Sequence, residues 1–385
     1  MTATVHGSPV RYDRNPASPI GAPTVGVEEE FALLDPGTGA VVPRAAEVIR
    51  DCRDPAGVVA ESMTFMVETR TPVCRTLREV QHALRTGRRR VADVAGRYGA
   101  VAVASGLAPF GLPSPPAVAD DPRYRELVRR FPLAMSTYGT CACHVHVAVP
   151  TRQLGVEALV RLRRWLPALI ALTANSPLWQ GRDTGWASQR WVFVSRWPTA
   201  VPAPPVRSID EYDALLSGAV SSGDALDTRS VYFLARLSPR YPTIEMRLAD
   251  VSLTADETLC YAGLVRALVT MAVEESLGGR PFAFVPQEVL RESCRSAARV
   301  GLAGTLTDPE TEERVESWAF VDRLVAQVSP QLCAHGDEAL VVSTLDRLRV
   351  VGGGAERQRG LFRAAPSPAA FVAALAKTTT ADLHA

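Results

Sequence analysis

Gly26-Val27-Glu28-Glu29-Glu30-Phe31 lies within residues 24–34, where apolar side chains alternate as they do in a β-strand. Every second side chain of an extended strand faces the same way, so Glu28 and Glu30 share one face and Glu29 takes the apolar face. We expect Glu29 to form a salt bridge at an edge or toward a helix. Carboxylates gathered on one face repel each other unless a cation lies between them. Surface glutamates more often lie on a solvated strand face, so this pair alone is weak evidence for a metal site.

Two further segments repeat this alternation. His144 and His146 share one face of a second expected strand, and Glu245 and Arg247 share one face of a third. Hard cations such as Mg²⁺ prefer oxygen ligands, and arginine supplies the positive charge that a phosphate needs. Together with the glutamates of the first strand, these pairs predict one metal and phosphate site on one face of a sheet.

A fourth segment runs from Glu61 to Glu68 and ends at Thr71-Pro72. In a regular strand the side chains of Glu61 and Glu68 point to opposite faces, so only one of them can share the site unless the strand has a bulge or bend. We favour Glu68, which stands beside the expected strand end.

Cys141, Cys143, His144 and His146 include the ligand types of a zinc or copper site. Strand parity opposes that interpretation, because the two cysteines share the face opposite to the two histidines. One ion cannot bind all four side chains without a bulge. We expect the cysteines to pack in the core and the histidines to face the acidic site, with a thiolate metal site as the alternative.

Arginine supplies almost all of the basic charge, since Lys377 is the single lysine among 42 basic residues. A P-loop, a protein kinase and a pyridoxal enzyme each need a lysine in a motif that this chain lacks. Any phosphate contact must therefore come from arginine, backbone or metal. A formal net charge of +1 is too small to indicate binding to nucleic acid, so we expect small-molecule partners and no nucleic acid.

Cysteine usage and the N-terminal residues indicate the compartment. The scattered cysteines form no C-x-x-C pair, which argues for a reducing environment; they are Cys52, Cys74, Cys141, Cys143, Cys260, Cys294 and Cys333. Residues 1–23 lack the basic and apolar run of a signal peptide, and no apolar stretch approaches about 18 residues. We expect a cytoplasmic protein with no membrane span, whose residues 1–23 form a disordered lead-in.

The order of the expected elements predicts an α+β fold with an antiparallel sheet, because strands come from separate places with helices between them. No repeat or clean boundary is visible, so residues 24–385 are expected to form a single domain with a helical C-terminal third. Further strands are expected at 101–104, 139–149, 231–237 and 243–249, helices at 74–97, 156–174, 209–220 and 254–277, and only helices after Pro286.

Residues 175–190 form a polar, turn-rich loop with two tryptophans and two arginines, Arg182 and Arg190. A surface loop is the simplest interpretation. Functional loops often have this composition as well, with arginines suited to the capture of a carboxylate or a phosphate.

The ordered set of motifs resembles the glutamate-cysteine ligase type 2 family of bacterial carboxylate-amine ligases. The resemblance runs from about residue 24 to about residue 380, and the set is specific although each motif alone is not. The motifs are Thr24-Val25-Gly26-Val27-Glu28-Glu29-Glu30-Phe31, Glu68-Thr69-Arg70-Thr71-Pro72-Val73-Cys74, Cys143-His144-Val145-His146-Val147, Ser176-Pro177-x-Trp179-x-Gly181-Arg182-Asp183-Thr184-Gly185, Arg196-Trp197-Pro198-Thr199, Thr243-Ile244-Glu245-Met246-Arg247-x-x-Asp250 and Gly352-Gly353-Gly354-Ala355-Glu356-Arg357-Gln358-Arg359.

This family is similar in fold to glutamine synthetase and the guanido kinases, which implies a curved antiparallel sheet that cradles ATP and metal ions, with helices packed on its outer face. The resemblance implies that the γ-carboxylate of glutamate attacks ATP to give an acyl phosphate. An amine, by default that of cysteine, then forms the amide as ADP and phosphate are released. Mg²⁺, or Mn²⁺ in its place, would accompany ATP, and catalysis would consist mainly of positioning and charge neutralisation.

Carried over by position, the metal ligands of the resemblance lie on the shared sheet face; they are Glu28, Glu30, Glu68, Glu245 and His144. Arg247 would contact the γ-phosphate and act with His144 in catalysis. Arg190 would contact the nucleotide.

The resemblance also assigns the α-carboxylate of glutamate to Arg182, with Trp186 and His146 in the substrate site. Three positions depart from the family pattern. Cys143 stands where methionine is usual, Trp186 where tyrosine is more usual, and Ala148 where glycine is common. These departures bear on the amine pocket more than on the activation chemistry.

Rival interpretations stay open. An amide ligase of a specialised pathway would use another amine, and the sequence identifies neither the amine, the number of metal ions nor the oligomeric state, a homo-oligomer included. A guanidino phosphotransferase would share the metal face but should have a reactive cysteine near the phosphate, and no cysteine has a persuasive position. A non-enzymatic metal-binding protein would leave the segments around Arg182 and Arg247 without a purpose.

Overall fold

The computed structural model describes residues 21–54, 57–137 and 139–383, so most of the expected lead-in, residues 1–20, lies outside the described residues. The strands are β1 (Val25–Leu34), β2 (Val58–Ala60), β3 (Met66–Arg70), β4 (Val101–Val103), β5 (Ala142–Ala148), β6 (Leu178–Trp179), β7 (Arg182–Asp183), β8 (Ala235–Leu237), β9 (Thr243–Asp250), β10 (Thr305–Thr307) and β11 (Arg314–Glu316). The α-helices are α1 (Ala45–Cys52), α2 (Leu77–Arg97), α3 (Pro122–Arg130), α4 (Pro132–Met135), α5 (Arg152–Leu162), α6 (Leu166–Thr173), α7 (Gln189–Val194), α8 (Ile209–Ser221), α9 (Ala255–Leu277), α10 (Gln287–Val300), α11 (Ser317–His335), α12 (Glu338–Val351), α13 (Gly354–Ala364) and α14 (Pro368–Thr379).

A seven-stranded antiparallel sheet forms the centre of the molecule. Its order is β2-β3-β1-β5-β9-β8, and β4 pairs with the end of β1. The three strands predicted to carry the site, β1, β5 and β9, are therefore neighbours. The predicted α+β fold with an antiparallel sheet is confirmed.

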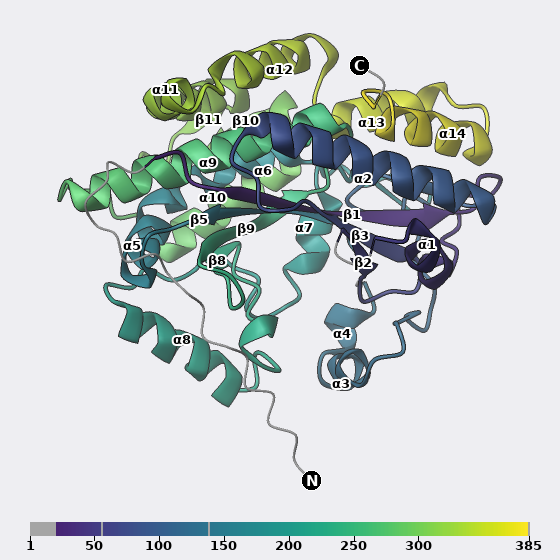
Figure 1. Cartoon of the computed structure of the whole chain (residues 1–385), viewed down its shortest axis with the longest axis horizontal. Helices are drawn as coiled ribbons and strands as arrows, with labels where there is room; N and C mark the ends of the chain where they lie inside the picture. The colour runs from purple at the N-terminus through teal and green to yellow at the C-terminus, as the bar shows by residue number, and fades with distance from the viewer. Residues whose placement is uncertain (1–20, 55–56, 138, 384–385) are drawn as a thin grey trace.

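Helices α2 and α9 cover one face of this sheet, and α11 to α14 lie further out on the same side (Figure 1). Most residues of α9 are buried, because this helix is apolar on nearly all sides and lies between the sheet and the outer helices. Val27 of β1, Val145 of β5 and Met246 of β9 belong to the same buried apolar cluster as α9. Helices α3, α4 and α8 lie on the opposite side of the sheet in Figure 1. The helices therefore leave the second face of the central strands free for polar side chains.

Glu29 lies on the helix-covered face, as the alternation predicts. Its carboxylate accepts hydrogen bonds from Arg88 of α2, at 2.6 Å and 3.0 Å, and from the hydroxyl of Thr258 in α9, at 2.6 Å. The side chains of Glu29 and Arg88 are both fully buried. The expected salt bridge toward a helix is confirmed.

Several predicted boundaries were wrong. The helix expected at 156–174 is two helices, α5 and α6, joined by the 3₁₀-helix Arg163–Trp165. Pro167 explains the break, since proline lacks an N–H group and fits the first turn of a new helix. The strand expected at 231–237 begins only at Ala235, and the C-terminal third contains the hairpin β10–β11 as well as helices. No helix among the described residues is both long and apolar enough to cross a membrane.

Candidate active site

A cavity of about 330 Å³ lies on the sheet face that turns away from α2 and α9. Glu28 and Glu30 enter it from β1. The strand register sets Glu28 opposite Arg70 of β3 and His144 of β5, and it sets Glu30 opposite Glu68 of β3. We call this space the acidic cavity. Its floor brings together the side chains that the alternation predicted to share one face.

Glu30, Glu61 and Glu68 bring carboxylate oxygens within 4.8 Å of one another. Burial and the charge of Glu61 raise the pKa of Glu30 to about 8. Burial, together with the charges of Glu28 and Glu61, raises the pKa of Glu68 well above its usual range. Burial and mutual repulsion therefore disfavour the ionised forms of Glu30 and Glu68, and a divalent cation between them would supply the compensating positive charge.

Glu68 lines the acidic cavity as expected, and Glu61 lines it too, which the alternation allowed only if the segment were bent. The parity rule assumed one regular strand from Glu61 to Glu68. In the structure β3 begins only at Met66, and residues 61–65 form a bend and a turn. The turn removes the parity conflict between the two glutamates.

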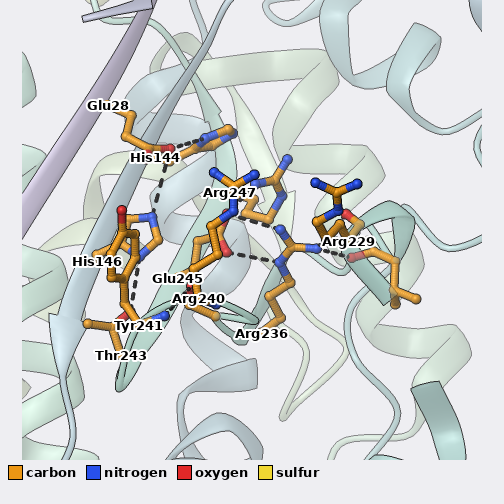
Figure 2. A network of polar contacts seen from close by, with 12 residues as sticks. Glu28, His144, His146, Arg229, Arg236, Arg240, Tyr241, Thr243, Glu245 and Arg247 are labelled. Carbon is orange, nitrogen blue, oxygen red and sulfur yellow. Dashed lines mark hydrogen bonds and ion pairs between the residues drawn. The ribbon is translucent and has the colours of Figure 1, made fainter. Parts of the chain in front are cut away.

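Glu28 lies between the two histidines of β5. His144 Nδ1 is 3.2 Å from Glu28 Oε2, and His146 Nε2 is 3.8 Å from the same oxygen (Figure 2). Burial works to raise the pKa of Glu28, but the two histidines outweigh it and hold that pKa below its usual range. Burial and the charge of Arg247 lower the pKa of His144 to about 4, so this ring is neutral at pH 7. A carboxylate accepts only, so Nδ1 carries the proton and Nε2 keeps a lone pair for a cation.

Glu245 of β9 forms ion pairs with two arginines, Arg236 and Arg247. Arg236 of β8 donates to it at 2.9 Å, and Arg247 forms a short contact with the same carboxylate (Figure 2). Burial opposes ionisation, but the charges of Arg236 and Arg247 keep the pKa of Glu245 well below its usual range. Glu245 is therefore an ionised carboxylate whose charge is already compensated.

A β-bulge in β9 sets the position of Arg247. Cys143 pairs with Ala249 and Val145 pairs with Met246, so Arg247 and Leu248 together lie opposite one residue of β5. A bulge re-aims the side chains around it. Arg247 lines the acidic cavity from this position.

Arg190, predicted to contact the nucleotide, is buried on α7. Its guanidinium donates to the backbone oxygens of Leu248, at 3.1 Å, and Arg247, at 3.4 Å, and lies 3.6 Å from Asp250. Arg190 lines a small space of about 40 Å³ that shares Glu30, His144 and Arg247 with the acidic cavity, but it does not line the acidic cavity itself. Its contacts in the structure are to the bulged segment of β9.

Arg182 and Trp186 are not brought to the acidic cavity. Arg182 is exposed on the β6–β7 hairpin, where it pairs with Trp179. Trp186 is half-buried, and Arg299 of α10 lies over its ring at 5.8 Å. Neither Arg182 nor Trp186 lines the acidic cavity, so their predicted contacts with substrate have no support from the geometry.

Cys141 and Cys143 pack in the two large apolar clusters of the fold. Burial raises the pKa of both thiols well above the usual range, so neither is a thiolate at neutral pH. His144 and His146 line the acidic cavity from the other side of the strand. The parity prediction is confirmed, and the thiolate metal site is not formed by these residues.

Sequence reasoning assigned no role to several residues of the acidic cavity. Arg70 forms a short contact with Glu68 and lies 3.7 Å from Glu28. Arg236 pairs in register with Glu245, and Tyr241 follows β8 in the turn before β9. Arg70 stands two residues after Glu68 and could have been found by the same alternation. Arg236 and Tyr241 could not, because their place depends on how β8 pairs with β9.

Comparison with known proteins identifies the family. A model described as glutamate-cysteine ligase family 2 (GCS2) matches residues 24–374. A protein from Saccharopolyspora erythraea, provisionally named glutamate–cysteine ligase 2-1, is 42% identical over 341 residues, covering 88% of this chain and 90% of the relative. A protein from Frankia alni, provisionally named glutamate–cysteine ligase 2-2, is 40% identical over 358 residues, covering 89% of this chain and 93% of the relative.

Solved structures show the same fold at low sequence identity. A glutamate–cysteine ligase from Francisella tularensis, solved in complex with AMP, has a TM-score of 0.64 at 10% identity, covering 95% of this chain and 94% of that chain. A bifunctional glutathione synthetase from Pasteurella multocida has a TM-score of 0.67 at 16% identity. The match covers 94% of this chain but only 52% of the bifunctional enzyme, so this chain spans about half of its length. By the family model and the close relatives, the chain belongs to glutamate-cysteine ligase family 2 and is a ligase of the carboxylate–amine class.

Proposed function

We propose that this protein joins the γ-carboxylate of glutamate to an amine, with cysteine as the default amine, at the expense of ATP. The observation that carries the proposal is the acidic cavity, in which a carboxylate cluster, two histidines and arginines meet on one sheet face. Such a set can bind Mg²⁺ and phosphate together. Family membership supports the same class of reaction.

The donor groups fit Mg²⁺ or Mn²⁺. Glu30, Glu61 and Glu68 would hold one ion, because their oxygens converge and a cation would offset the burial and repulsion that raise the pKa values of Glu30 and Glu68. Glu28, Glu245 and His144 are the other ligands expected from the sequence, and they line the same cavity. When bound, Mg²⁺ acts as a Lewis acid that offsets the negative charge on the phosphate oxygens.

The proposed reaction has two steps. An oxygen of the glutamate γ-carboxylate attacks the γ-phosphorus of ATP, and the bond between that phosphorus and the β,γ-bridging oxygen breaks. ADP departs as the leaving group, and the glutamate side chain becomes an acyl phosphate. The amine nitrogen then attacks the acyl carbon, the carbon–oxygen bond breaks, and phosphate leaves while the nitrogen loses a proton. Neither step needs a nucleophile from the protein, which agrees with a cavity of carboxylates and arginines.

Arg247 is the group proposed to contact the γ-phosphate. Its guanidinium contacts the carboxylate of Glu245 and lies over the ring of Tyr232, 5.8 Å from the ring centroid. These contacts position the guanidinium before a ligand binds. A positioned cation stabilises the charge that develops during phosphoryl transfer. Neutral His144 would hold Glu28 through Nδ1 and offer Nε2 to the metal.

The carboxylate and ammonium groups of the amino-acid substrates need charged partners. Arg182 was expected to bind the α-carboxylate of glutamate, but it does not line the acidic cavity. Arg123, Arg229 and Arg240 do line it. These three arginines are better placed than Arg182 to bind a substrate carboxylate.

The rival functions differ in what the cavity should contain. An amide ligase with another amine would use the same acidic cavity and stays an alternative. A guanidino phosphotransferase should present a reactive cysteine at the phosphate. Among the described residues the cysteines are buried except Cys333, which lies on α11, on the helix-covered side of the sheet (Figure 1). The geometry therefore favours a ligase.

The direct test is ADP release with Mg²⁺, ATP and glutamate, while the second substrate is varied over amino acids and simple amines. We expect release that depends on both glutamate and an amine, with cysteine among the best. Transfer of phosphate to creatine or arginine without amide formation would instead support the phosphotransferase.

A further inference from the structure

Asp250 is a buried carboxylate at the end of β9, three residues after Arg247, and it does not line the acidic cavity. It accepts a hydrogen bond from the backbone N–H of Asn175, at 2.8 Å. It also accepts hydrogen bonds from the hydroxyls of Ser176, at 2.7 Å, and Ser188, at 2.8 Å. Asp250 therefore connects both ends of the polar, turn-rich loop to the strand that carries Arg247.

Arg190 connects Asp250 to the bulge of β9. Its guanidinium lies 3.6 Å from Asp250 and donates to the backbone oxygens of Leu248, at 3.1 Å, and Arg247, at 3.4 Å. The backbone N–H of Arg190 donates to the hydroxyl of Ser176, at 3.1 Å, and the same hydroxyl donates to Asp250. A bulge disrupts the strand ladder locally, so side-chain donors fix the backbone where strand pairing does not.

Two glycines allow this network to pack closely. A Cβ atom at Gly106 would lie 2.7 Å from the carboxyl carbon of Asp250. A Cβ atom at Gly354 would lie 2.4 Å from Oδ1 of Asn175. A larger residue at either position would push the network away from β9, so these glycines supply the space for close approach.

The C-terminal motif that contains Gly354 packs on the same loop. Gln358 of α13 is fully buried and donates to the backbone oxygen of Asn175, at 2.8 Å, and to its Oδ1, at 2.7 Å. Arg359 donates to Asp183 of β7 at 2.9 Å and 3.1 Å. Neither the loop nor the C-terminal motif lines the acidic cavity. Their contacts instead lead to Asp250 through Asn175.

Resting on the proposed function, we propose that Asp250 is a positioning residue for phosphoryl transfer. Together with Arg190 it fixes the bulge of β9, and the bulge sets the direction of the Arg247 guanidinium in the acidic cavity. The loop and the C-terminal motif fix Asp250 in turn, and neither Asp250 nor Arg190 contacts a substrate. A displacement of about 1 Å at a reacting centre can slow catalysis by about 10²-fold, so a residue outside the cavity can control kcat.

The test is a double-mutant cycle of Asp250→Asn and Arg247→Lys in the full chain. ADP release is measured with ATP, Mg²⁺, glutamate and the best amine of the substrate screen. Asparagine keeps the size of Asp250 but replaces one accepting oxygen with an amide nitrogen that only donates. Asp250→Asn alone should lower kcat by about tenfold or more and leave the KM for glutamate within about twofold. In the Arg247→Lys protein the same change should lower kcat by less than about threefold, because the guanidinium that it positions is already absent.

Asp337→Asn is the matched control for loss of stability. Asp337 is also buried and accepts a hydrogen bond from a buried arginine, Arg266 of α9, at 3.1 Å, but it lies before α12 on the helix-covered side of the sheet. Asp337→Asn should lower the melting temperature and leave kcat within about twofold. If melting curves show that Asp250→Asn is not folded, Arg190→Lys takes its place in the cycle, because lysine keeps the charge and loses the guanidinium fork.

The outcomes separate this inference from the proposed function. If the kcat losses multiply in the double variant, Asp250 does not act through Arg247 and the inference is overturned. A folded Asp250→Asn protein with wild-type kcat also overturns it, and the ligase proposal stands in both cases. A selective increase in the KM for glutamate or ATP in Arg190→Lys would make Arg190 a substrate contact and overturn its positioning role. A wild-type protein that releases no ADP with any amine overturns the proposed function, and this inference falls with it.

Discussion

Arg88 of α2 contacts the middle residue of the glutamate triplet, Glu29, on the helix-covered face of the sheet, with both side chains fully buried. The same guanidinium donates to the backbone oxygens of Ser252, at 2.9 Å, and Thr379, at 3.2 Å. One arginine therefore connects β1, which carries Glu28 and Glu30, to the segment after β9 and to the C-terminal helix. The ion pair fixes the strand that bears the acidic site.

Arg88→Ala should lower the free energy of unfolding by about 3–5 kcal/mol, because it leaves the Glu29 carboxylate buried without its cation. Urea unfolding at pH 7 measures this loss. Arg125→Ala is the control, since Arg125 pairs with Asp120 at the surface and its removal should change stability little. An Arg88→Ala protein as stable as wild type would show that the pair does not hold β1.

Glu61→Gln should weaken Mg²⁺ binding by about tenfold or more, because it removes one charge from the Glu30–Glu61–Glu68 cluster. The Mg²⁺ concentration needed to raise the melting temperature measures the affinity. Glu47→Gln, at a surface glutamate paired with Arg44, serves as the control. Zinc should not replace Mg²⁺ in turnover, since the proposed ligands are mostly carboxylates. Equal Mg²⁺ affinity in the Glu61 variant would move the ion away from this cluster.

The metal-free protein should lose stability as the pH rises from about 4.5 to about 8. Glu30 keeps its proton in the folded state up to a pKa of about 8, while the unfolded chain loses it near 4.5. The folded state therefore binds more protons in this window, and its stability falls as pH increases. Melting temperatures in EDTA at pH 5, 6.5 and 8 test this. Glu30→Gln should flatten the trend, and a rise in stability toward pH 8 with no change in the variant would contradict it.

Arg247→Lys should mainly lower kcat, because a point-charge ammonium cannot reproduce the guanidinium contacts with a transferring phosphate. Arg182→Lys should change neither kcat nor the KM for glutamate by more than about twofold, since Arg182 is exposed on the β6–β7 hairpin. Steady-state kinetics with each substrate varied separates the two. A selective increase in the KM for glutamate in Arg182→Lys would restore the substrate role that the sequence resemblance implied.

The alternation of side chains predicted much of the site because burial imposes it. One face of β1, β5 and β9 packs against α9, so Glu28, Glu30, His144 and His146 had to share the other face. The same rule predicted that Glu29 forms a salt bridge. It could not name Arg88 as the partner, because that contact depends on how α2 crosses the sheet.

The residues that the alternation missed or misplaced depend on turns, on strand pairing or on the direction of a hairpin. Glu61 joins the cluster through a turn that the strand rule could not foresee. Arg236 reaches Glu245 because β8 pairs with β9, and strand pairing is a long-range property. Arg182 looked functional from its motif, but a motif does not fix the direction in which its hairpin points.

Transfer of an oxygen atom tests the central claim most directly. Glutamate carrying ¹⁸O in its γ-carboxylate is incubated with ATP, Mg²⁺, the amine and the enzyme, and the released phosphate is analysed by mass spectrometry. If the carboxylate attacks the γ-phosphorus and the acyl carbon–oxygen bond then breaks, each phosphate gains one ¹⁸O atom and the amide keeps the other. Release of ADP and phosphate at the same rate, with no ¹⁸O in the phosphate, would contradict the acyl phosphate and with it the proposed ligase mechanism.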